Sequence, residues 1–293
     1  MATLRELKGR IGSVASSEKI TGAMKMISSA KMHKAEQSLR RLLPFRNQIE
    51  SIIGNLLSAD TEFSSPLLEA RDVKHITVVV LGSDDGLCGA YNVNIFKRLL
   101  SVLAEYRQEY GQDVAIRICP VGNKICKAVA KLQSDNVSVK DADGVDSKTS
   151  GDGVRVFIED LQQDFLLGVT DKIDVLYMNF KSVSRQVLSH EQLLPIVQES
   201  FVNVSTQNNC KPYLFEPDAN TIFCSVLPMY LLAMMQDVFT ENRASEQAAR
   251  VMAMQSANDN AKKLLEQLRL EYNKLRQQSI TTELLDILGG QIK

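Results

Sequence analysis

The sequence contains no tryptophan, three histidines and five cysteines among 293 residues, and these scarcities exclude several kinds of site. The cysteines are odd in number, widely spaced and without a C-x-x-C pair, so a disulfide framework and a zinc knuckle fit poorly. They are Cys88, Cys119, Cys126, Cys210 and Cys224. We interpret them as reduced, buried thiols of a cytosolic protein. The histidines His33, His75 and His190 are so far apart that only the fold could assemble a catalytic or metal cluster from them.

The chain also lacks an excess of one charge and an evident membrane segment. It has 34 Lys and Arg against 35 Asp and Glu, a net charge of −1, which argues against a strongly basic nucleic-acid binder. No run approaches the 18 uncharged apolar residues of a membrane span. The opening MATLRELKGR is charged where a secretory signal is apolar, so we expect no signal peptide. Membrane contact is therefore expected only through a partner.

What the sequence does contain is a long helical segment at each end. From Thr3 to Ser58 there is one proline, Pro44, and apolar residues recur at intervals of three and four. This spacing is typical of an amphipathic or coiled-coil seam. The seam is predicted at Leu4, Leu7, Ile11, Val14, Ile20, Met24, Ile27, Ile49, Ile52, Ile53 and Leu56. Glycines each cost about 1 kcal/mol in a helix interior. We therefore expect another element to approach the backbone closely at Gly9, Gly12 and Gly22, or packing to hold the helix there.

The second helical segment is expected to start near Pro228, a residue suited to a first helical turn, and to stop at Gly289-Gly290. Its predicted seam comprises Leu231, Met235, Val238, Met254, Ala257, Ala261, Leu264, Leu268, Tyr272 and Leu275. At 1.5 Å rise per residue the two helices would be roughly 80 and 90 Å long, far longer than an ordinary helix of about 11–12 residues. Each has one apolar stripe, so the economical arrangement pairs the two stripes in an antiparallel two-helix rod.

Between the helices the pattern alternates between strands and helices. Residues 75–82 form a short β-branched run typical of a strand buried on both faces. Further strands are predicted at 114–120, 136–140, 173–180 and, as an edge strand, 183–188, with helices at 94–110, 123–132 and 154–167. This order favours a parallel or mixed sheet covered by helices.

The predicted fold is therefore α/β, with a long antiparallel two-helix coiled coil and an inserted Rossmann-like α/β domain. We divide the chain into an N-terminal coiled-coil helix (1–58), a linker (59–74), the α/β domain (75–205), a connecting segment (206–227) and a C-terminal coiled-coil helix (228–293).

Charge is distributed unevenly along this plan. Residues 1–50 carry ten Lys and Arg against four Glu, a balance of 10 − 4 = +6, whereas residues 229–293 carry eight of each sign. A basic helix is either a solvated face or a surface for an acidic protein partner, and both interpretations stay open. Nucleic acid is the poorest explanation, because no aromatic side chains are interleaved for stacking on bases.

The best candidate for a chemical site is the loop Gly82-Ser-Asp-Asp-Gly-Leu-Cys-Gly89. A glycine-bearing turn between strand and helix is where α/β folds bind phosphate. However, its glycines match neither dinucleotide-binding nor P-loop spacing, and Asp84 and Asp85 would repel a phosphate unless a metal intervened. A tight turn that needs small residues is the favoured interpretation, and the sequence shows no strong catalytic signature, metal site or cofactor site.

Three segments together resemble the gamma subunit of F-type ATP synthase, in its bacterial form. The first is Arg10-Ile-Gly-Ser-Val14 continuing to Lys19-Ile-Thr-Gly-Ala-Met-Lys-Met26 and Lys31. The second is Ser83-Asp-Asp-Gly-Leu-Cys-Gly89 with Asn92. The third is Ala249-Arg-Val-Met-Ala-Met254 with Asn258, Asn260, Leu268, Tyr272, Arg276, Gln277, Ile280-Thr-Thr-Glu283 and Gly289. Gly22, Asp85 and Gly290 depart from the residues common in the family, namely lysine, arginine and alanine.

The resemblance implies a non-catalytic shaft that couples proton flow to ATP synthesis or hydrolysis by rotation. The paired terminal helices would turn inside a ring of three alpha and three beta subunits. One copy would serve each complex, and the α/β domain would meet the epsilon subunit and the membrane c-ring. The location implied is the cytoplasmic face of the bacterial inner membrane, as a peripheral subunit.

The resemblance also places candidate contact residues. Met24, Lys25 and Met26 would lie near an acidic segment of beta, although a place in the seam is the alternative for both methionines. Arg276, Gln277, Thr281 and Glu283 would meet the upper part of the ring, and the apolar tip of Leu284, Leu285, Ile287 and Leu288 would fit a hydrophobic bearing. Fraying or self-association is the alternative for that tip. Tyr213 and Glu216 would face the c-ring.

Two other classes of function remain to be tested. A coiled-coil adaptor of another complex would share the helical ends without a reason to carry all three motifs. A nucleotide-binding α/β enzyme would use the loop at 82–89 as an isolated chain. We further predict that Lys25→Glu impairs coupling more than stability, because Lys25 is expected on the basic face rather than in the seam.

Overall fold

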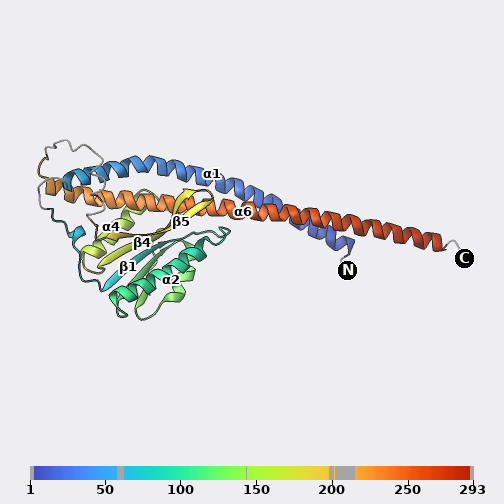
Figure 1. Cartoon of the computed structure of the whole chain (residues 1–293), viewed down its shortest axis with the longest axis horizontal. Coiled ribbons are helices and arrows are strands. Elements are labelled where there is room, and N and C mark those ends of the chain that lie inside the picture. Colours follow the sequence, from blue (N-terminus) through green and yellow to red (C-terminus); the bar gives the residue numbers. More distant parts are fainter. Residues whose placement is uncertain (1–2, 58–62, 143, 198–200, 202–214, 291–293) are drawn as a thin grey trace. The chain divides into compact units, whose positions relative to one another are not determined.

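The structure is a computed structural model, and it describes residues 3–57, 63–142, 144–197, 201 and 215–290. The chain forms two compact units, one from residues 1–29 and 250–293 and the other from residues 30–249. Helices α1 (Leu4–Leu57) and α6 (Ala219–Gly290) each contribute to both units (Figure 1). Each unit is described separately below.

The first unit is an antiparallel pair made by the start of α1 and the end of α6. Leu7 and Ser28 are the buried residues of its α1 part, and Asn258 on α6 donates to the backbone carbonyl of Glu18. The seam of α6 follows a spacing of three and four, through Val251, Met254, Asn258, Ala261, Leu265, Leu268, Tyr272, Leu275 and Ser279, all of them buried or half-buried. This is the heptad repeat of a coiled coil.

The expected seam is wrong by one position in the middle of this unit. Ile20 and Ile27 are 60% and 56% exposed, and Leu264 is 44% exposed. The buried or half-buried positions follow an unbroken heptad instead: Leu7, Ile11, Val14, Glu18, Thr21, Lys25 and Ser28 on α1, with Leu265 on α6. The apolar residues misled the prediction because polar side chains occupy four successive seam positions there.

The second unit holds a five-stranded sheet in the order β3-β2-β1-β4-β5. The strands are β1 (His75–Leu81), β2 (Ala115–Val121), β3 (Val137–Val139), β4 (Lys172–Ser182) and β5 (Arg185–Leu194). All described pairings are parallel except β4 with β5. The connecting helices are α2 (Tyr91–Tyr110), α3 (Asn123–Val129) and α4 (Asp152–Leu166), with short 3₁₀ turns at Pro66–Leu68 and Ala130–Leu132. The predicted order of strands and helices is confirmed, and the edge strand is longer than expected.

Alternate residues of each strand enter two different cores. Val78 and Val80 pack beneath α2 and α3, whereas Val79 and Leu81 pack on the opposite face with α4, α6 and α1. In Figure 1, α4 lies on the side of the sheet nearer α6, and α2 lies on the other side. Because the sheet is covered on both faces, its central strands are apolar at nearly every position.

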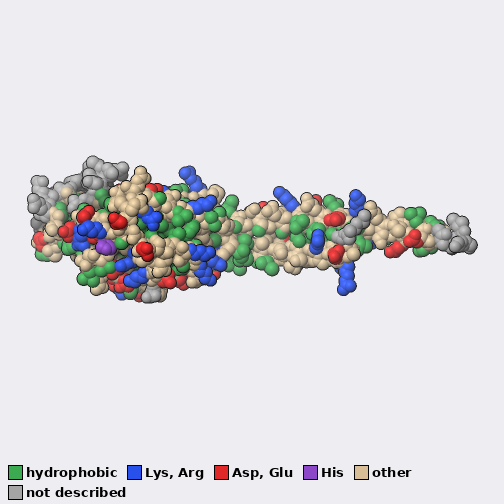
Figure 2. Space-filling view, turned by 90° about the horizontal axis from the view of Figure 1, so that it is seen from below, with side chains coloured by type: hydrophobic (Ala, Val, Ile, Leu, Met, Phe, Trp, Pro, Cys, Tyr) green, Lys and Arg blue, Asp and Glu red, His purple; other side chains and the backbone are tan. Residues whose placement is uncertain are grey.

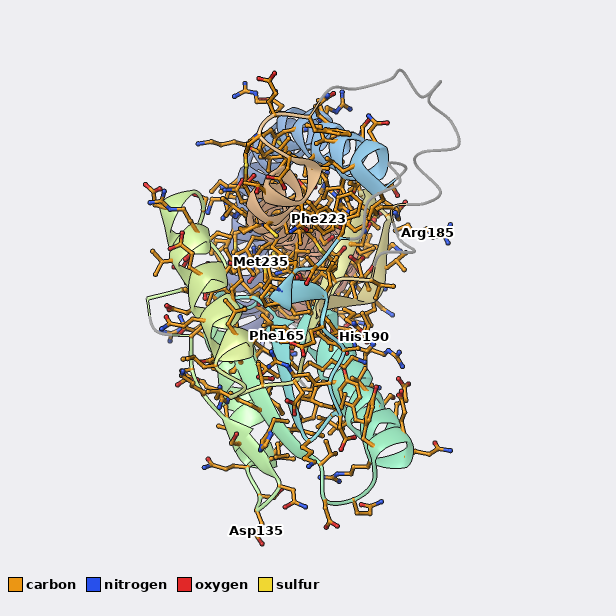
Figure 3. The ribbon with its side chains drawn as sticks, turned by 90° about the vertical axis from the view of Figure 1, so that its left-hand side faces the viewer. Asp135, Phe165, Arg185, His190, Phe223 and Met235 are labelled. Atoms are coloured by element: carbon orange, nitrogen blue, oxygen red, sulfur yellow. The ribbon has the colours of Figure 1, made fainter. Side chains whose placement is uncertain are left out.

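Within this unit α6 is the central core element. Phe223 and Leu231 are fully buried, and they belong to the same core as Ile53 of α1. Phe223 and Met235 point into the packed interior in the view of Figure 3. By length and composition α6 has one window apolar enough to cross a membrane, with 56% of that window buried inside the structure. The stretch 219–236 in fact contains no charged residue, contrary to our expectation, and it serves here as the core helix of the unit.

The start of α6 also differs from the prediction. The helix begins at Ala219 rather than at Pro228, because the carboxylate of Asp218 caps it by accepting from the Thr221 backbone N–H at 2.9 Å. Pro228 and Pro44 both lie inside helices at exposed positions. The expected close approach at glycines is confirmed for Gly22 and wrong for Gly9 and Gly12, where no described atom lies within 4 Å of a Cβ placed there.

Candidate functional site

The N-terminal candidates lie on α1 in the first unit. Met26 is 69% exposed, whereas Met24 and Lys25 are half-buried. A place in the seam is therefore wrong for Met26, whose side chain lies largely in solvent. Lys25 occupies a heptad position of α1, contrary to the expectation that it lies clear of the seam, and its aliphatic stem can pack there while its ammonium group stays in water.

The C-terminal candidates all lie on the part of α6 where the helix is solvent-exposed. They are Arg276, Gln277, Thr281, Glu283, Leu284 and Ile287. The hydroxyl of Thr281 donates to the backbone carbonyl of Gln277 at 2.9 Å, so it is satisfied within the helix. Leu284, Leu285 and Ile287 are 55%, 63% and 64% exposed. Such a run of apolar side chains in water is typical of a binding surface.

The candidate residues of the first unit are thus spread along its two helices. They lie outside the lining of a cavity of about 450 Å³ in this unit, which includes Glu18, Lys262, Glu266 and Arg269. In the face seen in Figure 2, Lys and Arg side chains stand out singly along the two helices, with polar and hydrophobic side chains between them. Of the two remaining candidates, Glu216 is exposed in the second unit, and Tyr213 lies outside the described residues.

The loop after β1 is held by its own hydrogen bonds. Gly82 leaves no room for a side chain, since a Cβ there would lie 2.6 Å from Cβ of Ile125. The Asn92 amide donates to the hydroxyl of Ser83 at 2.7 Å. The carboxylate of Asp84 accepts from the hydroxyl of Ser147 at 2.7 Å and from the backbone N–H of Asn123 at 3.1 Å. The loop is thus a tight turn, and the carboxylate of Asp84 holds the neighbouring segments at Asn123 and Ser147. This agrees with the favoured interpretation from the sequence.

The place where doubly wound folds bind ligands is filled by α6 itself. Strand order reverses between β1 and β4, and ligands usually bind outside the carboxyl ends of the strands at such a point. Here Asn242, 1% exposed, donates to the carbonyl of Gly82 at 3.1 Å. Its side-chain oxygen accepts from the hydroxyl of Tyr91 at 2.6 Å and from the backbone N–H of Met178 at 3.3 Å. Hydrogen bonds to Asn242 therefore attach α6 to the sheet at the position where a related fold would bind a nucleotide.

A cavity of about 320 Å³ lies beside these contacts of Asn242, and Arg243, the next residue of α6, is part of its lining. Its lining includes four cations, Lys31, Lys34, Lys148 and Arg243, and two carboxylates, Asp85 and Glu246, so the cations are in excess by two. The Arg243 guanidinium donates to the carbonyls of Ser147 and Thr149 at 3.2 and 2.8 Å, and burial lowers the pKa of Arg243. This cavity gives the second unit a locally positive surface although the globular segment is acidic overall.

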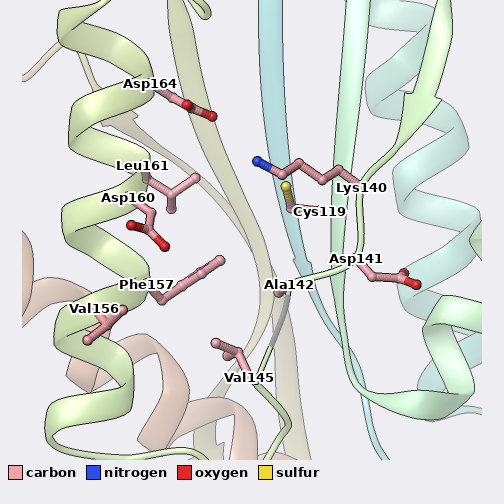
Figure 4. A pocket seen from close by; sticks show the side chains of 10 residues that line it. All are labelled: Cys119, Lys140, Asp141, Ala142, Val145, Val156, Phe157, Asp160, Leu161 and Asp164. Carbon is pink, nitrogen blue, oxygen red and sulfur yellow. The ribbon is translucent and has the colours of Figure 1, made fainter.

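A second cavity, of about 130 Å³, lies between β2 and α4 (Figure 4). The side chains of Phe157 and Leu161 point into it, and the Cys119 thiol lies at its back. Burial raises the pKa of Cys119 to about 11, so the group is a thiol at neutral pH and a poor nucleophile. Asp164 is paired with Arg117 at 2.8 Å. Among the described residues no group of three or more His, Cys, Asp or Glu could hold a metal ion.

Two carboxyl groups of α6 are buried or half-buried. Asp237 lies near Arg46 of α1, and the half-buried Glu241 lies near Tyr177 of β4 and Glu191 of β5. Burial raises the pKa of Glu241 to about 7, and the neighbouring carboxyls of Asp237 and Glu191 add to this effect. Burial also raises the pKa of Asp237, although Arg46, 3.5 Å away, opposes it. One oxygen of Glu241 and both oxygens of Asp237 are buried without a hydrogen-bond partner among the described residues.

Sequence reasoning missed the two asparagines that tie α6 to other backbone. Asn242 and Asn258 are both buried, at 1% and 9% exposure. The available signal was a polar residue at a position that the heptad or the core spacing assigns to the interior. That signal identifies the position but not the partner, which only the fold supplies.

Comparison with known proteins gives a consistent result over the full length. A family model described as ATP synthase matches residues 3–291. A protein of Phocaeicola vulgatus named ATP synthase gamma chain is 41% identical over 292 residues and covers 100% of both chains. The ATP synthase gamma chain of Bacteroides thetaiotaomicron is 38% identical over 302 residues, again covering 100% of both chains.

Solved structures share the fold at lower identity. A chain from the Euglena gracilis mitochondrial ATP synthase (OSCP/F1/c-ring) aligns with a TM-score of 0.64 and 20% identity, covering 98% of this chain and 93% of that one. A chain from the Tetrahymena thermophila mitochondrial ATP synthase central stalk and c-ring aligns with a TM-score of 0.58 and 20% identity, covering 81% and 99%.

Proposed function

The chain belongs to the family of ATP synthase gamma chains and is a non-catalytic central-stalk subunit of an F-type ATP synthase, and from this premise we propose how its surfaces work. One copy turns inside a ring of three alpha and three beta subunits. The α/β unit meets the epsilon subunit and the membrane c-ring. The single observation that carries the proposal is the full-length match to gamma chains, in a chain whose two ends pair as antiparallel helices.

The coupling follows from the asymmetry of the shaft. The three beta sites are chemically identical, so a symmetric shaft could not hold them in different states. Residues 1–50 carry a balance of +6, whereas residues 229–293 are neutral, so the two helices present unlike surfaces. Each orientation then acts as a ligand that favours a different beta conformation, and rotation moves the three sites through these states in turn.

We assign the contacts to separate stretches of the two helices. Met24, Lys25 and Met26 meet an acidic segment of beta, which the exposed Met26 and the basic character of α1 support. Arg276, Gln277, Thr281 and Glu283 meet the upper part of the ring. Leu284 and Ile287 turn in a hydrophobic bearing, which would cover the side chains that the chain leaves in water.

The opposite contacts involve the membrane sector. Tyr213 and Glu216 face the c-ring, and the chain is held peripherally at the cytoplasmic face of a bacterial inner membrane. Protons are the coupling ion in this proposal. The membrane itself is reached only through partners, because the uncharged stretch of α6 is used as the core of the second unit.

Reconstitution tests this function against its two rivals. We expect the purified full chain, mixed with alpha and beta subunits, to restore rotary ATPase activity and to support proton pumping once the membrane sector is added. A coiled-coil adaptor of another complex would fail to do so. Calorimetric titration of the isolated chain with ATP and Mg²⁺ should show no binding, whereas a nucleotide-binding enzyme would bind.

Photo-crosslinking tests the assigned contacts in the assembled enzyme. A photoreactive residue at Met26, Arg276 or Ile287 should give adducts with alpha or beta, and one at Glu216 should give adducts with epsilon or the c-ring. Asp72, an exposed residue of the second unit to which we assign no partner, serves as the matched control. Adducts of Met26 with the c-ring, or of Glu216 with beta, would contradict the assignment.

A further inference from the structure

Asn258 makes a polar contact between the two helices of the first unit. The side-chain amide of Asn258 donates to the backbone carbonyl of Glu18 at 2.7 Å and approaches the hydroxyl of Thr21 at 3.3 Å. Asn258 is only 9% exposed and occupies a heptad position of α6. Its amide is therefore directed across the seam into the backbone of α1.

The absent side chain of Gly22 makes this contact possible. A Cβ placed on Gly22 would lie 3.3 Å from Nδ2 of Asn258, tighter than ordinary van der Waals contact. A larger residue at this level would push the amide away from the carbonyl of Glu18. The glycine and the asparagine therefore fit each other in this chain.

The rest of the seam specifies its alignment weakly. The other α6 seam residues of this unit near Asn258 are apolar: Val251, Met254, Ala261, Leu265 and Leu268. The facing stretch of α1 offers polar or charged side chains at four successive heptad positions: Glu18, Thr21, Lys25 and Ser28. Both helices continue into the second unit, where Ile53 of α1 shares a core with Phe223 and Leu231 of α6, so a full heptad slip is excluded. What the seam of the first unit leaves weakly specified is a smaller local shift of the two helix ends, because apolar contacts are non-directional.

A buried asparagine at a heptad position is a means of fixing alignment in coiled coils at a cost in stability. Only one alignment brings the Asn258 amide to an accepting carbonyl beside a glycine. A local axial shift would carry Gly22 away from Asn258 and would bury its amide without this acceptor. The cost of the wrong alignment is that of an unpaired buried polar group.

We propose that Asn258 is a positioning residue that fixes the axial alignment of α1 against α6. Gly22 leaves the space that the Asn258 amide needs to reach the carbonyl of Glu18. This part of the inference rests on the proposed function. The alignment then sets the axial position and the angle at which the contact residues of the two helices meet the ring of alpha and beta subunits. A shaft with two populated alignments would present its α1 and α6 contacts out of phase, so that rotation would no longer drive all three sites correctly.

Distance measurements on the full chain test the alignment directly. Spin labels introduced as unnatural amino acids at Arg10 and Arg269, both exposed, report the axial offset of the two helices. The wild-type chain should give one narrow distance distribution. Asn258→Leu should broaden it or add a second population at a shifted distance, whereas the control Asn260→Leu, at an exposed position on the same helix, should leave it unchanged.

The substitution is expected to leave the chain folded. The hydroxyl of Thr21 still donates to the carbonyls of Ser17 and Glu18 at 3.0 Å, so neither partner loses its last hydrogen bond. Thermal unfolding of Asn258→Leu should therefore be unchanged or shifted upward. Gly22→Ala provides a second variant, because it keeps the asparagine and only displaces its amide, and it should broaden the distances less.

The same variants in the assembled enzyme separate this proposal from the proposed function. We expect Asn258→Leu to retain ATP hydrolysis but to lose severalfold in protons pumped per ATP, relative to Asn260→Leu. If Asn258→Leu and Gly22→Ala both give the single narrow distance distribution of the wild type, the proposal is overturned. Broadened distances with unimpaired pumping would support the alignment role and contradict the proposed function of the shaft.

Discussion

Neutralising Glu241 should stabilise the protein, and only at neutral to alkaline pH. The carboxyl lies on α6 beneath β5, and one of its oxygens is buried without a partner among the described residues. Burial raises the pKa of Glu241 from 4.5 to about 7 in the folded chain. The folded state therefore binds a proton that the unfolded state has already released between these two values.

The sign follows from linkage between protonation and folding. Because the folded pKa is raised, the carboxyl costs nothing extra below pH 4.5, costs progressively more as pH rises toward 7, and reaches its full cost above 7. A shift of this size would correspond to at most about 3 kcal/mol. Residual contact with water screens a half-buried group, so we expect about 1–2 kcal/mol. Glu241→Gln resembles the protonated form and escapes this cost.

Thermal unfolding of the full chain between pH 5 and pH 9 measures the effect. Glu241→Gln should melt only slightly above the wild type at pH 5, where a small part of the cost applies, and about 2–6 °C higher at pH 8.5. Glu266→Gln, at an exposed position on the same helix, is the matched control and should follow the wild type at every pH. A Glu241→Gln variant that melts below the wild type at pH 8.5, or equally shifted at both pH values, would refute the reasoning.

Three further substitutions test other parts of the structure. Lys25→Glu should reduce ATP-driven proton pumping by the assembled enzyme more than it lowers the melting temperature, and unimpaired pumping would count against a contact with an acidic partner. Gly12→Ala should stabilise the chain by roughly 0.5–1 kcal/mol in denaturant unfolding, since nothing described lies within 4 Å of the new methyl group; a loss of stability would reveal a contact that the structure lacks. Gly82→Ala should destabilise it by about 1–3 kcal/mol, because its Cβ would lie 2.6 Å from Cβ of Ile125, and a neutral result in the same assay would show that the turn can relax.

The register of the coiled coil shows where sequence patterns stop being sufficient. Ile20 and Ile27 carry the strongest apolar signal in their stretch, yet both are exposed. The heptad that starts at Leu7 passes instead through Thr21 and Ser28. A search for apolar periodicity cannot prefer polar residues at the seam. The burial of a polar seam residue depends on what the facing helix offers, and Thr21 meets the side-chain amide of Asn258, which donates to its hydroxyl at 3.3 Å.

The start of α6 shows a different limitation. Pro228 suits a first helical turn and therefore suggested a boundary. The helix nevertheless continues through it, because the carboxylate of Asp218 caps an earlier turn and the core residues Phe223 and Leu227 hold the preceding residues in place. A local preference worth a few kcal/mol is outweighed by the burial of several large side chains.

Some features of the candidate sites could be predicted from the sequence and others could not. Their positions on two long helices follow from the sequence, and the exposure of Met26, Arg276 and Ile287 agrees with a role at a surface. The hydrogen bonds of Asn242 could not be predicted from the sequence. They join a turn after β1, the start of α2, a residue of β4 and the middle of α6.

The sequence by itself determined the element types, because helical and strand periodicities and glycine-bearing turns are properties of neighbouring residues. It also determined the family, because three motifs lie in order along the chain. Only the tertiary structure decided which polar side chains are buried and what they hold. Those contacts join segments as far apart as Gly82 and Asn242, and hydrogen-bond geometry depends on how such segments meet in space.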